Sequence, residues 1–402
     1  MKDNQAKYPQ LRFKGFTNPW EQRKLGDIVV FLNGRAYKQA ELLDSGKYPV
    51  LRVGNFNTND KWYYSDLELP AKNYADKGDL LYTWATAFGP HIWKGPKVIY
   101  HYHIWKVETT SNISKNFAVH LLDADQAQMT NSLNGSTMVH ITKGTMENKI
   151  VTIPGISEQR NMARLLDQLD CTIALHQRKL AKLKELKQGY LQKLFPKNGS
   201  KFPQLRFAGF ADAWEQRKLG EHADILTGGT PKTSMSNYWE PKEIPWMSSG
   251  EVNKKRLDKT DNMISTEGLE NSSARWVKEH SIMIALAGQG KTRGTVAINN
   301  IPLTTNQSIA AIEPDETLNY EFVFQNLSKR YDELRIISSG DGTRGGLNKQ
   351  IVSDVIISAP SIEEQQKIGT LFQQFDTLIT LHQRKLEKLQ ELKKGYLQKM
   401  FC

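Results

Sequence analysis

The sequence predicts an α/β (α+β) protein: two globular domains in a pseudo-twofold arrangement, joined by two long antiparallel coiled-coil helices. Three observations lead to this prediction. The chain contains an internal repeat, and each copy ends in a segment of helix-forming composition. Between the constant segments, apolar runs such as residues 281–286 are followed by glycine-containing turns, which is typical of strands.

The repeat marks the beginning and the end of each half of the chain. Residues 9–26, PQLRFKGFTNPWEQRKLG, return at 203–220 as PQLRFAGFADAWEQRKLG, an offset of 194 residues. Residues 176–195, HQRKLAKLKELKQGYLQKLF, return at 382–401 as HQRKLEKLQELKKGYLQKMF, an offset of 206 residues. A constant frame therefore holds two inserts of almost unrelated sequence.

The two copies differ by 12 residues in length. At the offset of 206, Pro154 falls on Pro360 and Lys143 falls on Lys349. The length difference therefore lies upstream of about residue 134, within the inserts. One interpretation is simply two copies of a structural domain that drifted apart, but the helices of the frame favour a more specific one.

Each copy of the frame ends in a predicted helix. From Ser157 the chain lacks Gly and Pro until Gly189, Ser157 is a suitable N-cap, and Pro196 ends the helix. Heptad spacing places one residue set on a pairing seam in the first helix: Leu166, Leu169, Ile173, His176, Leu180, Leu183, Lys187, Tyr190 and Leu194. The second helix has the matching set: Phe372, Phe375, Ile379, His382, Leu386, Leu389, Lys393, Tyr396 and Met400.

Antiparallel pairing of these helices fits the short connection between the two copies, and one shared chain gives the pairing a high effective concentration. A helix of roughly 38 residues is about 57 Å long. Two domains held at its ends match DNA half-sites about 34 Å apart. The predicted division is 1–155 for the first domain, 156–195 for its helix, 196–201 for a linker, 202–361 for the second domain and 362–402 for its helix.

Composition points to a soluble protein with a polyanionic partner. Charged residues make up 24% of the chain, and the net charge of +11 with a pI near 9.3 favours nucleic acid. Neither a secretory signal nor a membrane-spanning stretch is evident, so we expect a cytoplasmic protein without membrane contact. Cys171 and Cys402 have no partner at metal spacing and are expected to be free thiols.

The repeated motifs resemble the specificity (S, HsdS) subunit of type I restriction-modification enzymes. The resemblance covers nearly the whole chain. Its carriers are the paired WEQRKLG segments, the paired HQRKL helices, and the exits IPGISEQRNMARLLDQLD at 153–170 and APSIEEQQKIGTLFQQFD at 359–376. The first exit has Gly-Ile-Ser between its proline and Glu158-Gln159, whereas the second has Ser-Ile-Glu.

The resemblance implies a function without catalysis by this chain. Each insert would be a target recognition domain that reads one half of a split, asymmetric site in double-stranded DNA. The helices would set the unread gap and dock two methyltransferase (M) subunits, to which restriction/translocase (R) subunits can add. S-adenosylmethionine, ATP and Mg²⁺ would be bound by those partners, and no cofactor or metal is expected on this chain.

The residues themselves favour the same interpretation, because catalytic motifs are missing. Asn18-Pro19-Trp20 lacks the second proline of an adenine methyltransferase tetrapeptide, and no carboxylate cluster suggests a nuclease. The octet ALAGQGKT at 285–292 fits a loose phosphate-loop pattern, but Arg293-Gly294-Thr295-Val296 follows it where a helix is needed. We therefore expect a hairpin turn that presents Lys291 and Arg293.

Basic side chains in the inserts are the candidate DNA contacts, since Lys and Arg neutralise phosphates or bind guanine edges. In the first insert and its exit these are Arg35, Lys38, Lys61, Lys94, Lys97 and Lys143. In the second they are Lys232, Lys254, Lys255, Arg256, Arg275, Lys291, Arg293, Arg344 and Lys349. Met138 stands in the register position of Arg344, so the two domains are expected to read different bases.

Two other interpretations remain open at this point. One is a coiled-coil adaptor without a DNA role, and the other is a nucleotide-driven protein that uses Gly290, Lys291 and Thr292. His101 and His103 share one strand face, but without a further ligand nearby we assign them a structural role rather than a metal site.

Overall fold

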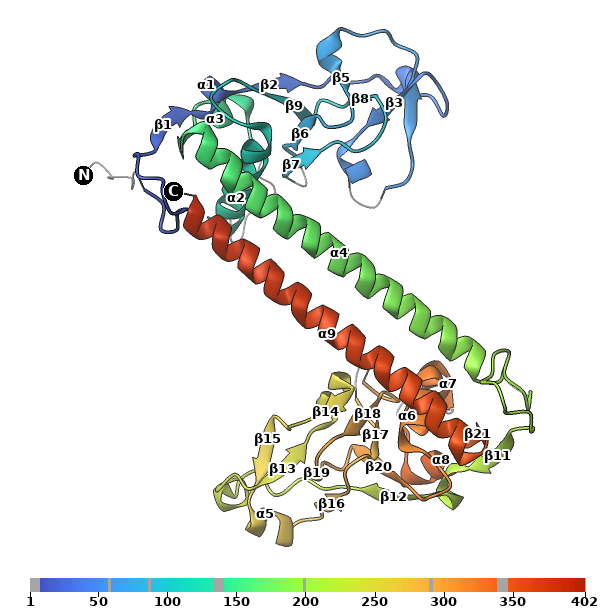
Figure 1. Ribbon diagram of the computed structural model, residues 1–402. Helices are drawn as coiled ribbons and strands as arrows, with labels where there is room; N and C mark the ends of the chain where they lie inside the picture. Colours follow the sequence, from blue (N-terminus) through green and yellow to red (C-terminus); the bar gives the residue numbers. More distant parts are fainter. Residues whose placement is uncertain are drawn as a thin grey trace. The chain divides into compact units, whose positions relative to one another are not determined.

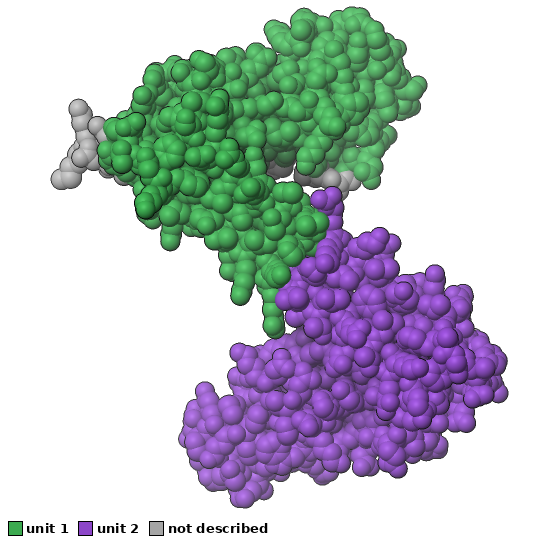
Figure 2. Space-filling model, in the orientation of Figure 1, with its two compact units in different colours: residues 1–177, 384–402 green, residues 178–383 purple. Residues whose placement is uncertain are grey.

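The computed structural model describes residues 8–56, 59–85, 88–132, 141–197, 200–288, 292–337 and 346–401, without the side chains of 128–132. The chain divides into two compact units (Figures 1 and 2). Unit 1 contains residues 1–177 and 384–402, and unit 2 contains residues 178–383. The division cuts both long helices, so each unit combines segments from both copies of the repeat.

Unit 1 holds two four-stranded sheets, ordered β2-β9-β6-β7 and β4-β3-β8-β5, and a separate two-stranded pair of β1 with β10. Its strands are β1 (Glu21–Lys24), β2 (Val29–Asn33), β3 (Tyr48–Leu51), β4 (Tyr63–Ser65), β5 (Tyr74–Ala75), β6 (Leu80–Thr83), β7 (Gly89–Ile92), β8 (Val98–Tyr100), β9 (Ile104–Thr109) and β10 (Ile150–Ile153). Besides the long helices described below, its α-helices are α1 (Leu25–Ile28), α2 (Lys115–Ser132) and α3 (Lys143–Glu147). Its 3-10 helices, labelled η, are η1 (Gln39–Glu41), η2 (Val53–Phe56) and η3 (Ala71–Asn73).

Unit 2 holds a five-stranded sheet, β12-β20-β17-β18-β14, a four-stranded sheet, β15-β13-β19-β16, and the pair β11 with β21. Its strands are β11 (Glu215–Lys218), β12 (Ala223–Thr227), β13 (Ile244–Met247), β14 (Arg256–Leu257), β15 (Asn262–Ile264), β16 (Trp276–Val277), β17 (Ile282–Ala285), β18 (Val296–Asn299), β19 (Leu303–Thr305), β20 (Ile309–Pro314) and β21 (Ile356–Ala359). Its short helices are η4 (Leu219–Glu221), η5 (Ser236–Tyr238), η6 (Ser249–Lys254), α5 (Thr266–Glu270), α6 (Tyr320–Lys329), α7 (Tyr331–Ile337) and α8 (Lys349–Ser353).

The two inserts share one topology although their sequences differ. β2 pairs with β9 as β12 pairs with β20, and the central parallel pair β3–β8 corresponds to β13–β19. The remaining strands match in the same order, and β14 is the addition in unit 2. The chain therefore has the predicted fold class, with two α/β domains and two long helices.

Two helices of 39 residues each, α4 (Ile156–Leu194) and α9 (Ile362–Met400), run through the units. Within unit 1, Leu166 of α4 lies in one core cluster with Met400 of α9, and Asp170 pairs with Lys393. Within unit 2, Lys187 pairs with Asp376, and the Tyr190 and Phe375 rings lie 5.6 Å apart. Residue numbers rise along one helix as they fall along the other, so the helices pair antiparallel in each unit.

The predicted seam residues of both helices are all buried or half-buried in the structure. Other leucines of the same helices are exposed on a different face, namely Leu175, Leu186, Leu378, Leu381 and Leu392. The difference follows from helix periodicity, because only residues spaced by alternating steps of three and four return to the paired side.

The frame makes the same contacts in both units. Arg12 forms a bidentate ion pair with the buried carboxylate of Glu158 in unit 1, and Arg206 does the same with Glu364 in unit 2. The adjacent Gln159 donates to the Pro154 carbonyl and accepts from the backbone N–H of Ser114. In each exit, the buried glutamate therefore forms the ion pair with the arginine. The glutamine beside it forms hydrogen bonds with nearby backbone groups that would otherwise lack a partner.

The end of each long helix completes a core. Phe401 stacks on Phe117 in unit 1, with ring centroids 5.5 Å apart. Phe195, its counterpart, lies 5.2 Å from Phe322 in unit 2. A backbone hydrogen bond accompanies each ring, from Leu11 N–H to the Lys399 carbonyl and, in unit 2, between the equivalent residues Leu205 and Lys193, both at 2.9 Å. Among the described residues, no helix combines the length and apolar character that crossing a bilayer requires.

Candidate nucleic-acid interface

The octet ALAGQGKT begins at the end of β17 and continues into the following loop. β17 pairs antiparallel with β18, so residues 286–295 connect the two strands of a hairpin. A phosphate-binding loop needs a helix N-terminus directly after its lysine and hydroxyl residue. A strand occupies that place here, which confirms the predicted hairpin and removes the basis for a nucleotide site.

This hairpin loop lies beside two other segments of unit 2. The Leu286 N–H donates to the Ser308 carbonyl at 2.8 Å, and the Leu347 N–H donates to the Leu286 carbonyl at 3.1 Å. Arg293 is half-buried within the loop. The β6–β7 loop of unit 1 has five residues where the β17–β18 loop has ten, so part of the length difference between the copies lies here. Five positions discussed from the sequence lie outside the described residues: Lys291, Arg344, Met138, Gly290 and Cys402.

In unit 1, Arg35 lies next to the turn between β8 and β9. Its N–H donates to the Tyr100 carbonyl at 3.2 Å, and its carbonyl accepts from the Tyr102 N–H at 3.0 Å. The guanidinium pairs with Glu41 at 2.8 Å and holds the pKa of that carboxyl below its ordinary value. Lys38 precedes η1, and its N–H also donates to Glu41. The Arg35 side chain is thus held in place by Glu41, which also caps the start of η1.

The other predicted cations of unit 1 are distributed over separate loops. Lys61 and Lys97 are exposed and lie over the rings of Tyr63 and Tyr74, 5.3 and 4.5 Å from the centroids. Lys94 is exposed between β7 and β8. Lys143 begins α3 and pairs with Glu147 at 3.4 Å. Such positions suit phosphate contacts, which need a reachable charge but little fixed geometry.

In unit 2, Lys232, Arg275 and Lys349 are exposed. Lys254 pairs with two carboxylates, those of Glu251 at 2.8 Å and Asp261 at 2.7 Å. Lys255 has a positive φ of 66°, and burial together with the neighbouring Lys187 ammonium lowers its pKa. These lysines therefore differ in how readily they can meet a phosphate.

Arg256 has a structural environment. From β14 it pairs with Glu321 at 2.5 Å and with Asp376 at 3.0 Å. Lys187 pairs with the same Asp376 at 2.5 Å. The network joins the extra strand of unit 2 to α6 and to both long helices. Two carboxylates therefore already hold the Arg256 guanidinium, and its charge is compensated within unit 2.

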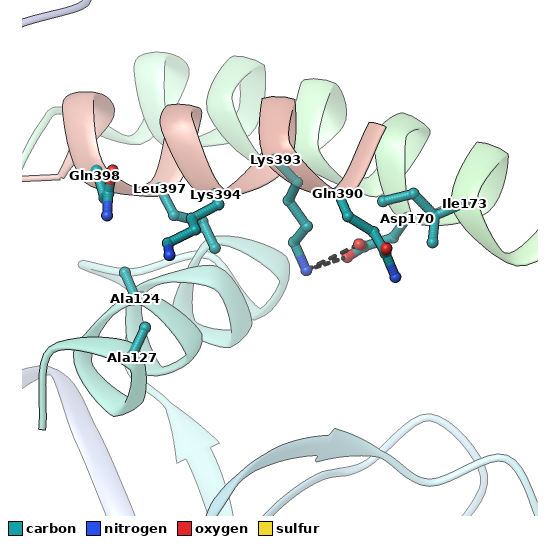
Figure 3. A pocket seen from close by; sticks show the side chains of 9 residues that line it. All are labelled: Ala124, Ala127, Asp170, Ile173, Gln390, Lys393, Lys394, Leu397 and Gln398. Carbon is teal, nitrogen blue, oxygen red and sulfur yellow. Dashed lines mark hydrogen bonds and ion pairs between the residues drawn. The ribbon is translucent and has the colours of Figure 1, made fainter. Parts of the chain in front are cut away.

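The corresponding region of unit 1 is a hollow between α2, α4 and α9 (Figure 3). Lys393 pairs with Asp170 at 2.8 Å and with Asp123 of α2 at 3.0 Å. These carboxylates overcome the effect of burial and raise the Lys393 pKa. Among the described residues of unit 1, no strand corresponds to β14, so none of its described strands brings an arginine to the pair.

The structure brings two of the predicted cations, Arg35 and Arg293, to segments that contact the three-residue turns β8–β9 and β19–β20. Sequence reasoning based on charge missed the turns themselves, because their residues are His101, Tyr102, His103, Asn306, Gln307 and Ser308. One signal was available, since Gly34, which lies against His101, and Gly228, which lies against Thr305 just before the second turn, stand at the frame offset of 194.

Comparison with known proteins gives a consistent result. A family model described as the type I restriction modification DNA specificity domain matches residues 17–185 and 211–391. The specificity subunit of the type I restriction enzyme EcoR124I/EcoR124II of Escherichia coli is 28% identical over 166 residues, which are 41% of this chain and 41% of that protein. The chain thus matches less than half the length of that relative.

Longer matches cover both copies of the repeat. The MjaVIII specificity subunit of Methanocaldococcus jannaschii is 22% identical over 391 residues, 93% of this chain and 90% of that protein. The crystal structure of the S subunit from M. genitalium has the same fold, with a TM-score of 0.69 and 15% identity over 98% of this chain and 99% of that one. Since the family model matches each copy and most of the chain, the protein belongs to the type I restriction-modification specificity subunits.

Proposed function

We propose that the chain is the non-catalytic subunit that selects the DNA sequence for a type I restriction-modification complex. Each insert reads one half of a bipartite site in double-stranded DNA, and α4 and α9 set the unread gap. One observation carries this proposal: identical frame contacts hold two domains of the same topology whose surface residues differ. A constant support with variable side chains suits the reading of two different half-sites.

The partners follow from the same proposal. Methyltransferase subunits, joined by restriction/translocase subunits, supply S-adenosylmethionine, ATP and Mg²⁺ chemistry in the cytoplasm. The exposed leucines support docking on the long helices, since Leu175 and Leu186 recur as Leu381 and Leu392 at the offset of 206. Each pair is 11 residues apart and shares one helix face. A surface present twice fits two copies of one partner.

The first experiment is co-expression of the chain with its candidate methyltransferase subunit in a host without other modification, followed by genome-wide mapping of methylated bases. We expect a single split motif with a fixed unread gap. Exchange of residues 27–134 for those of another specificity subunit should change one half of the motif only. A stable complex without new methylation, or a change in both halves, would contradict the proposal.

Docking is tested separately by the paired substitutions Leu175→Glu and Leu381→Glu. Charges on this face should abolish co-purification of the methyltransferase subunit, because the partner cannot bury them. The matched control is Gln177→Glu with Gln383→Glu, two exposed positions on the same helices at the same offset. Equal loss of co-purification by the control would show that the effect is general repulsion and not loss of this face.

A further inference from the structure

Two short turns occupy the same place in the two units. Residues 101–103, His-Tyr-His, connect β8 to β9 in unit 1, and residues 306–308, Asn-Gln-Ser, connect β19 to β20 in unit 2. No residue is shared between them. Each turn nevertheless joins the parallel central strand of one sheet to the long strand of the other sheet.

The same backbone hydrogen bonds hold both turns. The first residue donates its N–H to the end of the neighbouring parallel strand, from His101 to Leu51 at 2.9 Å and from Asn306 to Met247 at 3.1 Å. The carbonyl of the third residue accepts from the hairpin loop, from the N–H of Trp84 to His103 at 3.2 Å and of Leu286 to Ser308 at 2.8 Å. The backbone of the turn is thus fixed independently of its side chains.

A glycine packs closely against the start of each turn, against His101 in unit 1 and against Thr305, the residue just before the turn, in unit 2. A Cβ on Gly34 would lie 2.3 Å from the His101 carbonyl oxygen, and one on Gly228 would lie 2.0 Å from the Thr305 carbonyl oxygen. Both distances are far below van der Waals contact, so glycine is required at both positions. The inserts have kept this requirement while almost all of their other residues changed.

Exposure of the side chains is also the same. In both turns the middle residue is exposed and its two neighbours are half-buried. Tyr102 is 40% exposed, a large value for an aromatic residue. The structure therefore presents one protruding side chain, supported on both sides, at the same place on each recognition domain.

The chemistry that the turns present differs. In unit 1 the Tyr102 ring lies 4.4 Å from the His101 ring and 3.9 Å from the His103 ring, and the Trp84 indole N–H donates to the Tyr102 carbonyl at 2.8 Å. The surface is aromatic. In unit 2 the Thr230 hydroxyl donates to the Gln307 side-chain oxygen at 2.6 Å, and the Asn306 side chain accepts from the Ser308 N–H at 3.1 Å. The surface there consists of amide and hydroxyl groups.

Constant backbone with changing side chains is the pattern that base reading requires. Contacts to phosphates position a protein on DNA, whereas side chains at base edges distinguish sequences. A glutamine amide can bind adenine through both of its polar groups, and aromatic or imidazole groups contact the thymine methyl or accept and donate at other edges. Arg35 lies beside the first turn and Arg293 lies in the loop that contacts the second turn, so one arginine stands near each turn.

We propose that these two turns read bases, one turn for each half-site, with Tyr102 and Gln307 as the specificity-determining side chains and Gln307 selecting an A·T pair. The inference rests on the proposed function and adds residues to it. Neither turn contains a lysine or an arginine, so a search for positive charge does not find these turns. The comparison of two inserts with unrelated sequences and the same fold does find them.

The test grafts one turn onto the other domain. The triple variant His101→Asn, Tyr102→Gln and His103→Ser is co-expressed with the methyltransferase subunit, and methylated bases are mapped. We expect the gap and the second half of the motif to stay unchanged while one or more positions of the first half change. The reciprocal graft, Asn306→His, Gln307→Tyr and Ser308→His, should change only the second half.

A milder variant covers the case in which a graft does not fold, as judged by circular dichroism. Gln307→Ala keeps the backbone contacts, and it should lower the preference for the cognate base pair at one position of the second half by about 5- to 150-fold. The preference is measured as relative methylation of oligonucleotides that differ at single positions. Glu316→Gln, an exposed position of the same unit, is the control and should leave every preference unchanged.

The outcomes separate the two proposals. A wild-type complex that yields no split motif overturns the proposed function. A wild-type split motif that Gln307→Ala and any folded graft leave intact overturns the assignment of the turns alone. A change in both halves after a graft in one turn also overturns it, because each turn is assigned to one half-site.

Discussion

The frame and the inserts of this protein show two different ways to preserve a structure. In the frame, the residues themselves recur: Arg12 and Arg206 bind Glu158 and Glu364 in the same bidentate geometry. In the inserts, strand order and backbone hydrogen bonds recur while the side chains differ. A buried ion pair depends on particular atoms, whereas a sheet needs only alternating apolar residues and its backbone. Only the inserts are therefore free to acquire new surfaces.

The largest expected effect tests whether the two copies of the frame are equivalent. Arg12→Ala and Arg206→Ala should each lower the free energy of unfolding of their own unit by about 4 kcal/mol, because a buried carboxylate loses its partner. Peptide-resolved hydrogen exchange measures each unit separately. Arg23→Ala is the control, since its pair with Glu21 is exposed and contributes under about 1 kcal/mol. Clearly unequal losses in the two units would contradict the equivalence, and faster exchange in both units after one substitution would contradict the local action of each ion pair.

The next effect concerns the ends of the long helices. Phe401→Ala should cost about 3 kcal/mol and should raise exchange in the first insert, although Phe401 belongs to the second copy of the repeat. Phe195→Ala should act on the second insert instead. Leu392→Ala, at an exposed position of α9, should change stability by less than about 0.5 kcal/mol. Loss of protection in the second insert after Phe401→Ala would be inconsistent with these contacts.

A smaller effect should distinguish the two units. Lys393→Met leaves Asp170 and Asp123 without their shared ammonium, whereas after Lys187→Met the Asp376 carboxylate still has Arg256. We expect a cost of about 2 kcal/mol for the first substitution and about 1 kcal/mol for the second. Urea denaturation of the two variants gives the comparison. Equal costs would show that Arg256 does not compensate for the lost lysine.

The smallest effect depends on pH. Burial, with help from His103 and Arg52, lowers the pKa of His101 to about 4. An unfolded histidine takes up a proton near pH 6.5, so this group's contribution is intact above that pH and is lost as the pH falls toward 4. Between pH 7 and pH 5 the free energy of unfolding, measured by urea denaturation, should fall more for the wild type than for His101→Asn, by a difference on the order of 1 kcal/mol. Parallel curves would count against this assignment.

The sequence allowed correct prediction of the features that depend on local pattern. The repeat, the two long helices and the hairpin at residues 285–296 all follow from spacing and composition. The role of Arg256 did not, because its partners Glu321 and Asp376 are 65 and 120 residues away along the chain. A positive charge marks a residue as a possible DNA contact. Only the fold shows whether carboxylates of the protein itself already pair with that charge.

The division of the chain into units has a consequence for its synthesis. The residues that complete unit 1, 384–402, leave the ribosome only after the whole of residues 178–383. At about 5–20 residues per second, that interval is roughly 10–40 s. During this time the apolar surface around Phe117 lacks its contact with Phe401. In unit 2, by contrast, Phe195 has already been synthesised when the strands of that unit emerge. The first insert is therefore made before the second but completed after it, and its apolar surface is exposed to aggregation during that interval.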